Sequence, residues 1–280
     1  MDHNIPNTGL LPNSLERITN WNINPGSQRW PLIIAHRGDT SASPENTMPA
    51  FYRAIEAGAD GIELDVRLTR DKELVVFHDY TLGRTSDGYG LVNHYTLKEL
   101  LSLDVGSWFS PRFTGEPPPS LDQVFESLPR DFLLNVEMKV VIKDMQQVAH
   151  RVAETIARHQ RRASTLVASF NPVALYHLRR LDPRIARGYI WSRYHPYPIR
   201  ARWLMPLVQA HWYDPANDTY NLRVHRNFRR KQRRVLAWDV DFGGDLELMA
   251  SVRLDAVVTN APAQMVQRKQ QLSQAAGTDG

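Results

Sequence analysis

Short apolar runs alternate with amphipathic stretches along most of this chain, which predicts strands and helices in turn. Most runs are rich in aliphatic and branched side chains, as is typical of strands that are buried on both faces. The expected strands are residues 32–35, 61–66, 132–138, 165–169, 185–191, 208–212, 235–240 and 256–259. The main helices between them are expected at residues 47–58, 121–128, 144–161, 172–181, 221–232 and 245–253. This alternation favours an α/β fold with parallel strands.

A ninth apolar run, residues 74–77, interrupts the alternation. Only residues 67–73 separate it from the run at 61–66, whereas a crossover between parallel strands needs about a dozen residues or more. We therefore predict an antiparallel hairpin that turns near residues 70–72. This hairpin would return His78 to the carboxyl end of the strand at 61–66.

We predict a closed (β/α)8 TIM barrel over residues 31–268, with the hairpin strand as an extra element. Residues 79–120 are rich in Gly, Pro and Ser and contain one predicted helix near residues 96–103, so they are interpreted as a small insertion. Residues 1–30 are expected to be an N-terminal extension and residues 269–280 a flexible polar tail.

Composition narrows the possible chemistry. The chain has no cysteine, which excludes disulfides, a thiolate nucleophile and cysteine-ligated metals. No apolar run approaches the length of a transmembrane helix, and the first thirty residues lack the basic start and apolar core of a signal peptide. We expect a soluble cytoplasmic protein whose modest net charge of +4 is concentrated late in the chain.

Ionisable and aromatic residues stand at the carboxyl ends of several predicted strands, where the active sites of such barrels lie. They are His36, Arg37, Glu63, Asp65, His78, Glu137, Lys139 and Trp238. Because Glu63 and Asp65 are two positions apart on a strand, they point the same way, and the lumen is a less costly environment for carboxylates than packed helices.

Three carboxylates without His or Cys ligands predict an oxygen-only metal site, which suits Mg²⁺ or Ca²⁺ better than zinc. Glu137 would join Glu63 and Asp65 there. The alternative is a buried ion-pair network with Arg37 and Lys139. We favour the metal because several unpaired acids repel one another without a cation.

His36 and His78 would flank this metal site. Cleavage of a phosphodiester requires one group to accept a proton from the nucleophile and another to protonate the leaving alkoxide. The planar guanidinium of Arg37 suits phosphate oxygens. The set therefore predicts a phosphodiesterase with a pair of acid/base histidines.

Five motifs in order support this chemistry: His36-Arg37-Gly38, Pro44-Glu45-Asn46-Thr47, Glu63-Leu64-Asp65-Val66, Val76-Phe77-His78-Asp79 and Glu137-Met138-Lys139. Together they resemble the glycerophosphodiester phosphodiesterase family. The resemblance implies a TIM barrel and metal-dependent hydrolysis of glycerophosphodiesters to glycerol 3-phosphate and an alcohol, as part of lipid or glycerol metabolism.

The resemblance also implies roles for individual residues. His36 and His78 match the acid/base pair. The metal ligands of the family are matched by Glu63, Asp65 and Glu137. The phosphate-contacting cations would be Arg37 and Lys139, and Glu45 matches a carboxylate near the metal or the substrate.

Two late segments depart from the family pattern. Residues 238–241 are Trp-Asp-Val-Asp where the family commonly has Trp-Thr-Val-Asn, and Asn260 stands where an Asp is usual. Trp238 is retained, so we expect it to contact the substrate.

Residues 189–234 contain many aromatic and basic side chains. One interpretation is a contact with a membrane surface and a pocket rim for a lipid chain, which would make the enzyme a lysophospholipase D. For the basic residues we favour the solvated face of an outer helix.

We do not expect nucleic-acid binding, because the basic stretch is short and has few aromatic residues. A non-catalytic phosphate-binding barrel is disfavoured, since no histidine or metal carboxylate is missing.

Overall fold

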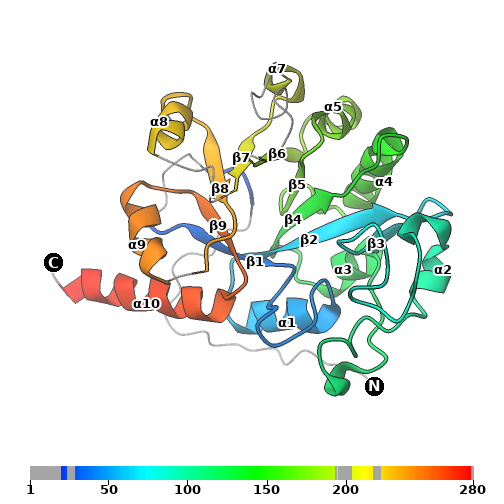
Figure 1. Cartoon of the computed structure of the whole chain (residues 1–280). Helices are drawn as coiled ribbons and strands as arrows, with labels where there is room; N and C mark the ends of the chain where they lie inside the picture. The colour runs from blue at the N-terminus through cyan, green and yellow to red at the C-terminus, as the bar shows by residue number, and fades with distance from the viewer. Residues whose placement is uncertain are drawn as a thin grey trace.

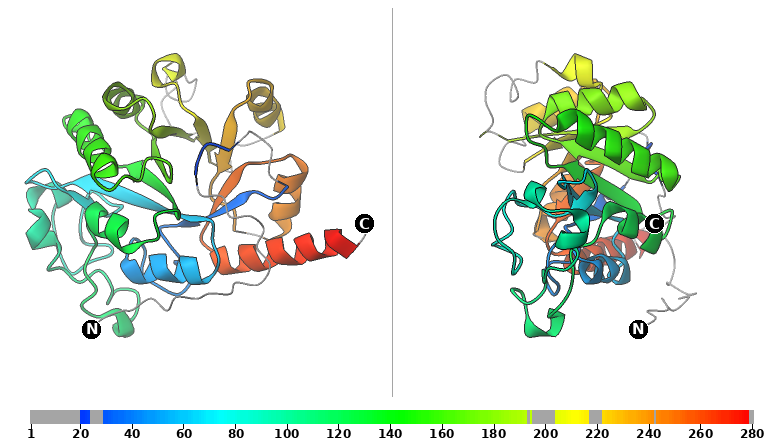
Figure 2. Two further views of the ribbon diagram at one scale, coloured as in Figure 1. Left: turned by 180° about the vertical axis from the view of Figure 1, so that it is seen from behind. Right: turned by 90° about the vertical axis from the view of Figure 1, so that its right-hand side faces the viewer.

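The computed structural model of this protein describes residues 20–23, 29–192, 194, 204–216, 222–241 and 243–278. Eight parallel strands close into a barrel, and helices surround it (Figure 1; Figure 2 shows two further views). The strand order is β1-β9-β8-β7-β6-β5-β4-β2, and the pairing of β1 with β2 closes the ring. The predicted TIM barrel with one extra strand is confirmed.

The elements follow the predicted alternation closely. The barrel strands are β1 (Leu32–His36), β2 (Gly61–Leu68), β4 (Leu133–Met138), β5 (Thr165–Ser169), β6 (Ala186–Trp191), β7 (Trp212–Pro215), β8 (Arg234–Ala237) and β9 (Ala256–Thr259). The helices that follow them are α1 (Met48–Glu56), α3 (Leu121–Ser127), α4 (Met145–Arg158), α5 (Pro172–Leu181), α7 (Met205–Val208), α8 (Leu222–Arg230), α9 (Gly243–Ser251) and α10 (Pro262–Thr278).

The turn after β1 positions the first site residues. Gly38 has φ +86°, and a Cβ there would lie 2.7 Å from the backbone and Cβ of Ala50, so only glycine permits this turn against α1. Thr47 caps α1, since its hydroxyl accepts a hydrogen bond from the amide of Ala50 at 3.4 Å. The loop between β1 and α1 is therefore held at both ends.

The predicted hairpin is confirmed. Strand β3 (Leu74–Val76) pairs antiparallel with β2, and Lys72 adopts φ +66° in the turn. The amide of Phe77 donates to the carbonyl of Asp65 at 2.9 Å, which brings His78 to the carboxyl end of β2.

The insertion after β3 has its own small core. It contains η1 (Val92–His94), α2 (Leu97–Leu100) and η2 (Pro111–Phe113), and it lies beside β2 and β3 at one side of the barrel (Figures 1 and 2). Its core residues are Val75, Phe77, Leu82, Val92, Leu100 and Val105. The insertion therefore packs on the face of the hairpin that leads to His78.

Trp21 fills the amino-terminal end of the lumen. Its ring lies edge-on to Trp212 at 5.1 Å, among the first lumen residues of the strands, such as Leu32 and Leu133. Its Nε1 donates to the carbonyls of Leu134 and Ser164. Of the predicted extension, residues 20–23 thus include the plug of the barrel floor, whereas residues 1–19 and 24–28 lie outside the described residues. The carboxyl-terminal end of the lumen is left for polar side chains.

One predicted strand was wrong. Residues 208–212 do not form a strand, because Val208 ends α7 and β7 begins only at Trp212. The apolar run reflects burial of Val208 and Ala210 in a helix end and a loop. His211 consequently stands at the amino end of β7, where its Nδ1 accepts a hydrogen bond from the amide of Arg187 at 3.1 Å, away from the site.

The expected tail also differs from the structure, since α10 is helical to Thr278. Lys269 on this helix pairs with Asp60 at 2.9 Å, and Leu272 packs against the main core. These contacts hold the helix to the barrel. None of the described helices is both long and apolar enough to cross a membrane.

Candidate active site

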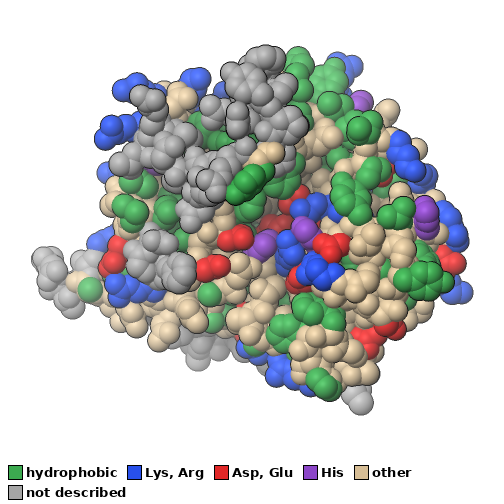
Figure 3. All heavy atoms as spheres, in the orientation of Figure 1, with side chains coloured by type: hydrophobic (Ala, Val, Ile, Leu, Met, Phe, Trp, Pro, Cys, Tyr) green, Lys and Arg blue, Asp and Glu red, His purple; other side chains and the backbone are tan. Residues whose placement is uncertain are grey.

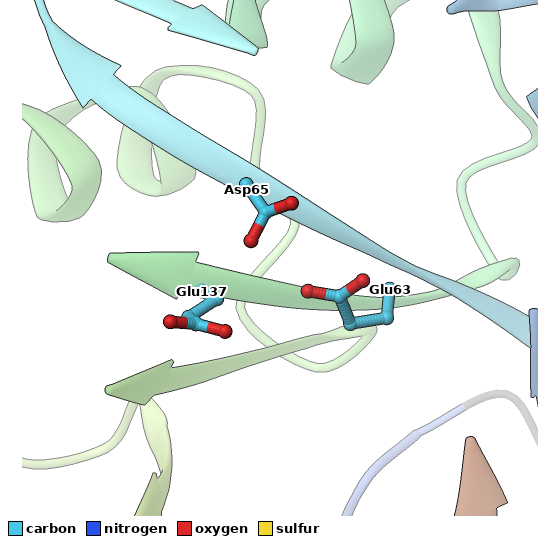
Figure 4. Close-up of side chains that lie close together, drawn as sticks. All are labelled: Glu63, Asp65 and Glu137. Carbon is cyan, nitrogen blue, oxygen red and sulfur yellow. The ribbon is translucent and has the colours of Figure 1, made fainter. Parts of the chain in front are cut away.

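Three buried carboxylates meet at the carboxyl end of the barrel. Glu63 and Asp65 are on β2 and Glu137 is on β4, and the strand register places Asp65 beside Glu137. One oxygen of each lies within 4.8 Å of the others. Figure 4 shows the three groups directed toward a shared space.

The cluster is electrostatically strained. Burial, together with repulsion from the other two acids, raises the pKa of Glu63 well above its usual value, and burial raises that of Glu137. Burial alone would also raise the pKa of Asp65, but Lys139 and Arg37 hold it below the usual value. An oxygen-only donor set with unrelieved negative charge fits a hard divalent cation.

Two cations border this cluster. Lys139 Nζ lies 2.7 Å from Glu137 Oε1 and 3.3 Å from Asp65 Oδ1, and Arg37 Nε lies 3.3 Å from Asp65 Oδ2. Part of the alternative ion-pair network is therefore present. Glu63, however, forms no ion pair with Lys or Arg within the described ranges; its contacts there are the amide of Arg37 at 3.1 Å and His36 Nε2 at 3.9 Å.

Glu45 lies on the other side of Arg37. Its carboxylate accepts hydrogen bonds from Arg37 at 2.8 Å and from Arg84 at 2.7 and 2.9 Å. Arg84 also binds Asp79 at 2.6 Å. This geometry makes Glu45 a residue that orients Arg37. Arg84 and Asp79 were not among the predicted site residues, although both lie in or beside segments that resemble the family.

His36 is held by a chain of polar groups. Asp241 accepts from Asn260 Nδ2 at 3.0 Å, which turns the amide oxygen of Asn260 toward His36 Nδ1 at 2.7 Å. Because an amide oxygen only accepts hydrogen bonds, Nδ1 carries the hydrogen and Nε2 of the neutral ring is free to accept a proton. That Nε2 is the atom on the side of Glu63.

His78 is held in a similar way. Its Nδ1 lies 2.5 Å from Asp79 Oδ1, and its backbone carbonyl accepts from Arg67 Nε at 2.9 Å. A carboxylate only accepts, so Nδ1 again carries the hydrogen and Nε2 is the exchangeable position. Burial lowers the pKa of His78 from its usual value, although the nearby charge of Asp65 opposes this effect.

A cavity of about 230 Å³ joins these groups. Figure 3 shows a hollow in which acidic, basic and histidine side chains gather. Of the predicted site residues, it is lined by His36, Arg37, Glu63, His78, Glu137, Lys139 and Trp238. Asp65 belongs to the carboxylate cluster beside it. Asp214 and Asn135 also line this cavity, and neither was predicted.

Trp238 and Phe170 form an aromatic wall of the cavity. Their rings meet edge to face at 5.8 Å, and Trp238 Nε1 donates to the carbonyl of Asp214 at 3.0 Å. A second cavity of about 490 Å³ shares His78, Glu137, Lys139 and Phe170 with the first. Two spaces therefore adjoin at His78.

Comparison with known proteins agrees with this geometry. The model of the glycerophosphoryl diester phosphodiesterase family matches residues 36–264. This chain belongs to that family. A glycerophosphodiester phosphodiesterase from Caldanaerobacter subterraneus subsp. tengcongensis is 35% identical over 237 residues, which cover 84% of this chain and 96% of the relative. The resemblance of the five motifs is confirmed, and with it the expectation of an enzyme of this family.

Two solved structures with the same fold are similar to this chain. One is an Oleispira antarctica phosphodiesterase in complex with the product sn-glycerol-3-phosphate, with a TM-score of 0.79 and 29% identity over 86% of this chain and 97% of that one. The other is a glycerophosphodiester phosphodiesterase from Agrobacterium tumefaciens, with a TM-score of 0.73 and 26% identity over 85% of this chain and 99% of that one.

Two of the three positions that depart from the family pattern form one hydrogen-bonded pair, and the third, Asp239, has its Oδ1 3.5 Å from His36 Nδ1. Asp241 stands where the family commonly has Asn, and Asn260 stands where it usually has Asp. The pair therefore still contains one carboxylate and one amide, joined at 3.0 Å beside His36.

This exchange generates a test. Asn260→Asp alone would replace the hydrogen bond to Asp241 by repulsion between two carboxylates and should lower kcat about tenfold, because the group that accepts from His36 Nδ1 is pushed out of position. The double variant Asn260→Asp with Asp241→Asn again has one carboxylate and one amide. Its kcat should therefore recover at least a third of the lost log kcat. Steady-state kinetics of the three proteins would measure it. No recovery in a folded double variant would show that the pair does not act through this contact.

Proposed function

We propose that this protein hydrolyses glycerophosphodiesters to glycerol 3-phosphate and an alcohol, with a divalent cation and two histidines. The observation that carries the proposal is the cluster of Glu63, Asp65 and Glu137 at a cavity that His36 and His78 also line. Membership of the family supports it. The sn-glycerol-3-phosphate in the Oleispira complex is the product expected of this reaction.

Each residue has a role in this proposal. Glu63, Asp65 and Glu137 would hold Mg²⁺ or Ca²⁺, which when bound would neutralise charge on the phosphoryl oxygens. Arg37 and Lys139 would bind the same oxygens and stabilise the charge that develops there. Trp238 would contact the substrate's organic part as an aromatic wall, and Glu45 would act on the substrate through Arg37.

The histidines would move the protons. One of His36 and His78 accepts the proton of the nucleophile at its Nε2, and the other donates a proton to the leaving alkoxide from the same position. The nucleophile is either water or the glycerol 2-hydroxyl, and detection of a cyclic phosphate in the products would identify the second route.

Loss of either histidine should be severe. We expect His36→Ala and His78→Ala each to lower kcat by about 100-fold or more, because each removes one proton transfer. His150→Ala on the outer face of α4 is the matched control and should leave kcat unchanged; its side chain is 62% exposed. Wild-type turnover in either active-site variant would rule out the two-histidine mechanism.

Removal of the metal should abolish activity. A panel of glycerophosphodiesters assayed after chelation should show no turnover, and added Mg²⁺ or Ca²⁺ should restore it. Glu63→Gln should raise the metal concentration needed for half-maximal activity, because a neutral amide replaces a charged ligand. Glu56→Gln, on the surface, is the control. Full activity in the presence of chelator would contradict the metal site.

Lysophospholipids are the alternative substrate class, with the enzyme acting as a lysophospholipase D at a membrane surface. Leu204, which precedes α7, and Leu207 within α7 are exposed, as are Arg226 and Arg230 on α8, and these side chains favour it. Part of the predicted 189–234 surface, residues 193, 195–203 and 217–221, lies outside the described residues. Of the basic residues, Arg229 contacts Asp255 at 3.4 Å within the fold.

Side-by-side assays separate the two substrate classes. We expect faster hydrolysis of glycerophosphocholine than of lysophosphatidylcholine, since most of the residues that line the lumen cavity are polar or charged and would pack poorly against an acyl chain. A higher kcat/KM on the lipid would reverse the assignment. The cytoplasmic location expected from the sequence stays a prediction.

A further inference from the structure

One buried acid in the cavity has no partner. Asp214 on β7 is 1% exposed, and neither of its carboxyl oxygens has a hydrogen-bond partner within the described part of the chain. Leaving a buried polar group unsatisfied costs on the order of 1–3 kcal/mol. Native structures contain few such groups, and they tend to have a functional reason.

The fold makes room for this acid. A Cβ on Gly188 of β6 would lie 2.5 Å from Asp214 Oδ2, so any larger residue there would displace the carboxyl group. Below it, two residues earlier on the same strand, Trp212 packs against the floor plug. Asp214 is therefore at the first polar level of the lumen and lines the same cavity as His36 and Trp238.

The surroundings of Asp214 favour one kind of ligand. It forms no ion pair with Lys or Arg in the residues that the structure describes, and it is not part of the carboxylate cluster. Burial, with the charge of Glu137, raises the pKa of Asp214 well above its usual value. A neutral carboxylic acid both donates and accepts a hydrogen bond, as a hydroxyl does, whereas an ammonium group would need a carboxylate anion.

We propose that Asp214 binds a hydroxyl of the glycerol part of the substrate inside the lumen. The glycerol carbons would then lie along the wall of Trp238 and Phe170, and the alcohol would extend toward the larger cavity beyond His78. This inference rests on the proposed function and adds to it the residue that distinguishes a glycerol diester from other phosphodiesters.

Binding of two monophosphates tests this role without depending on turnover. The probes are sn-glycerol 3-phosphate and n-propyl phosphate, which has the same carbon chain without hydroxyls, each measured by calorimetry in buffer with Mg²⁺. Asp214→Ala should weaken binding of glycerol 3-phosphate about tenfold and leave propyl phosphate unchanged. Asp214→Asn should stay within about threefold of wild type, because an amide also donates and accepts.

A second variant displaces the carboxyl group without removing it. Gly188→Ala places a methyl group against Asp214 Oδ2 and should produce the same selective loss. Thermal unfolding of each variant would show that it is folded. Equal weakening of both probes, or no change in either, would overturn the proposal, as would an Asp214→Asn variant as weak as Asp214→Ala.

Turnover by the wild-type protein distinguishes failure of the proposed function from failure of the proposed role of Asp214. If the wild-type protein hydrolyses no glycerophosphodiester with any metal, the proposed function fails. If it does so and the variants show no selective loss of glycerol 3-phosphate binding, only the role of Asp214 fails.

Discussion

Repulsion among Glu63, Asp65 and Glu137 is the constraint on which the rest of this site depends. Three acids are buried with oxygens within 4.8 Å of one another, which is costly unless positive charge lies among them. The fold provides part of this charge through Lys139, which pairs with Asp65 and Glu137, and through Arg37, which pairs with Asp65. Glu63 is left without such a partner among the described residues, so the arrangement favours a divalent cation over a closed network.

Contacts outside the carboxylate cluster hold Arg37 and His78 in place. Glu45 binds Arg37 together with Arg84, and Arg84 in turn binds Asp79, which orients His78. The network on this side therefore links Arg37 and His78 through Arg84. On the other side of the lumen, Asn260 and Asp241 orient His36 independently. Each histidine is positioned by its own polar partners, which reduces the reorganisation needed at reaction.

The two ends of the lumen differ in polarity. Trp21 and Trp212 fill its amino end with apolar surface, while the carboxyl end contains nearly all of the ionisable side chains of the site. Asp214 lies between the apolar floor and the charged end of the lumen. It is buried from solvent and forms no ion pair among the described residues. Its placement gives the cavity an asymmetric floor, with a hydrogen-bonding group on one side and the Trp238 and Phe170 wall on another.

Local patterns in the sequence were enough to determine the barrel, the hairpin and the residues at the strand ends. Strand periodicity and the short 67–73 connection are properties of neighbouring residues, and they correctly placed His36, His78 and the three acids at one end of the barrel. The sequence pattern failed where burial alone produced an apolar run, at residues 208–212, and this error concealed Asp214.

Tertiary structure alone decided which distant groups meet. His36 and Asn260 are 224 positions apart and touch only because β1 pairs with β9 when the barrel closes. The contacts of Arg84, Trp21 and Asp214 likewise depend on closure, which no local period encodes. The sequence by itself therefore determined the chemistry available at the strand ends. Closure of the barrel decided the orientation of those groups and placed Asp214 in the lumen without a hydrogen-bond partner among the described residues.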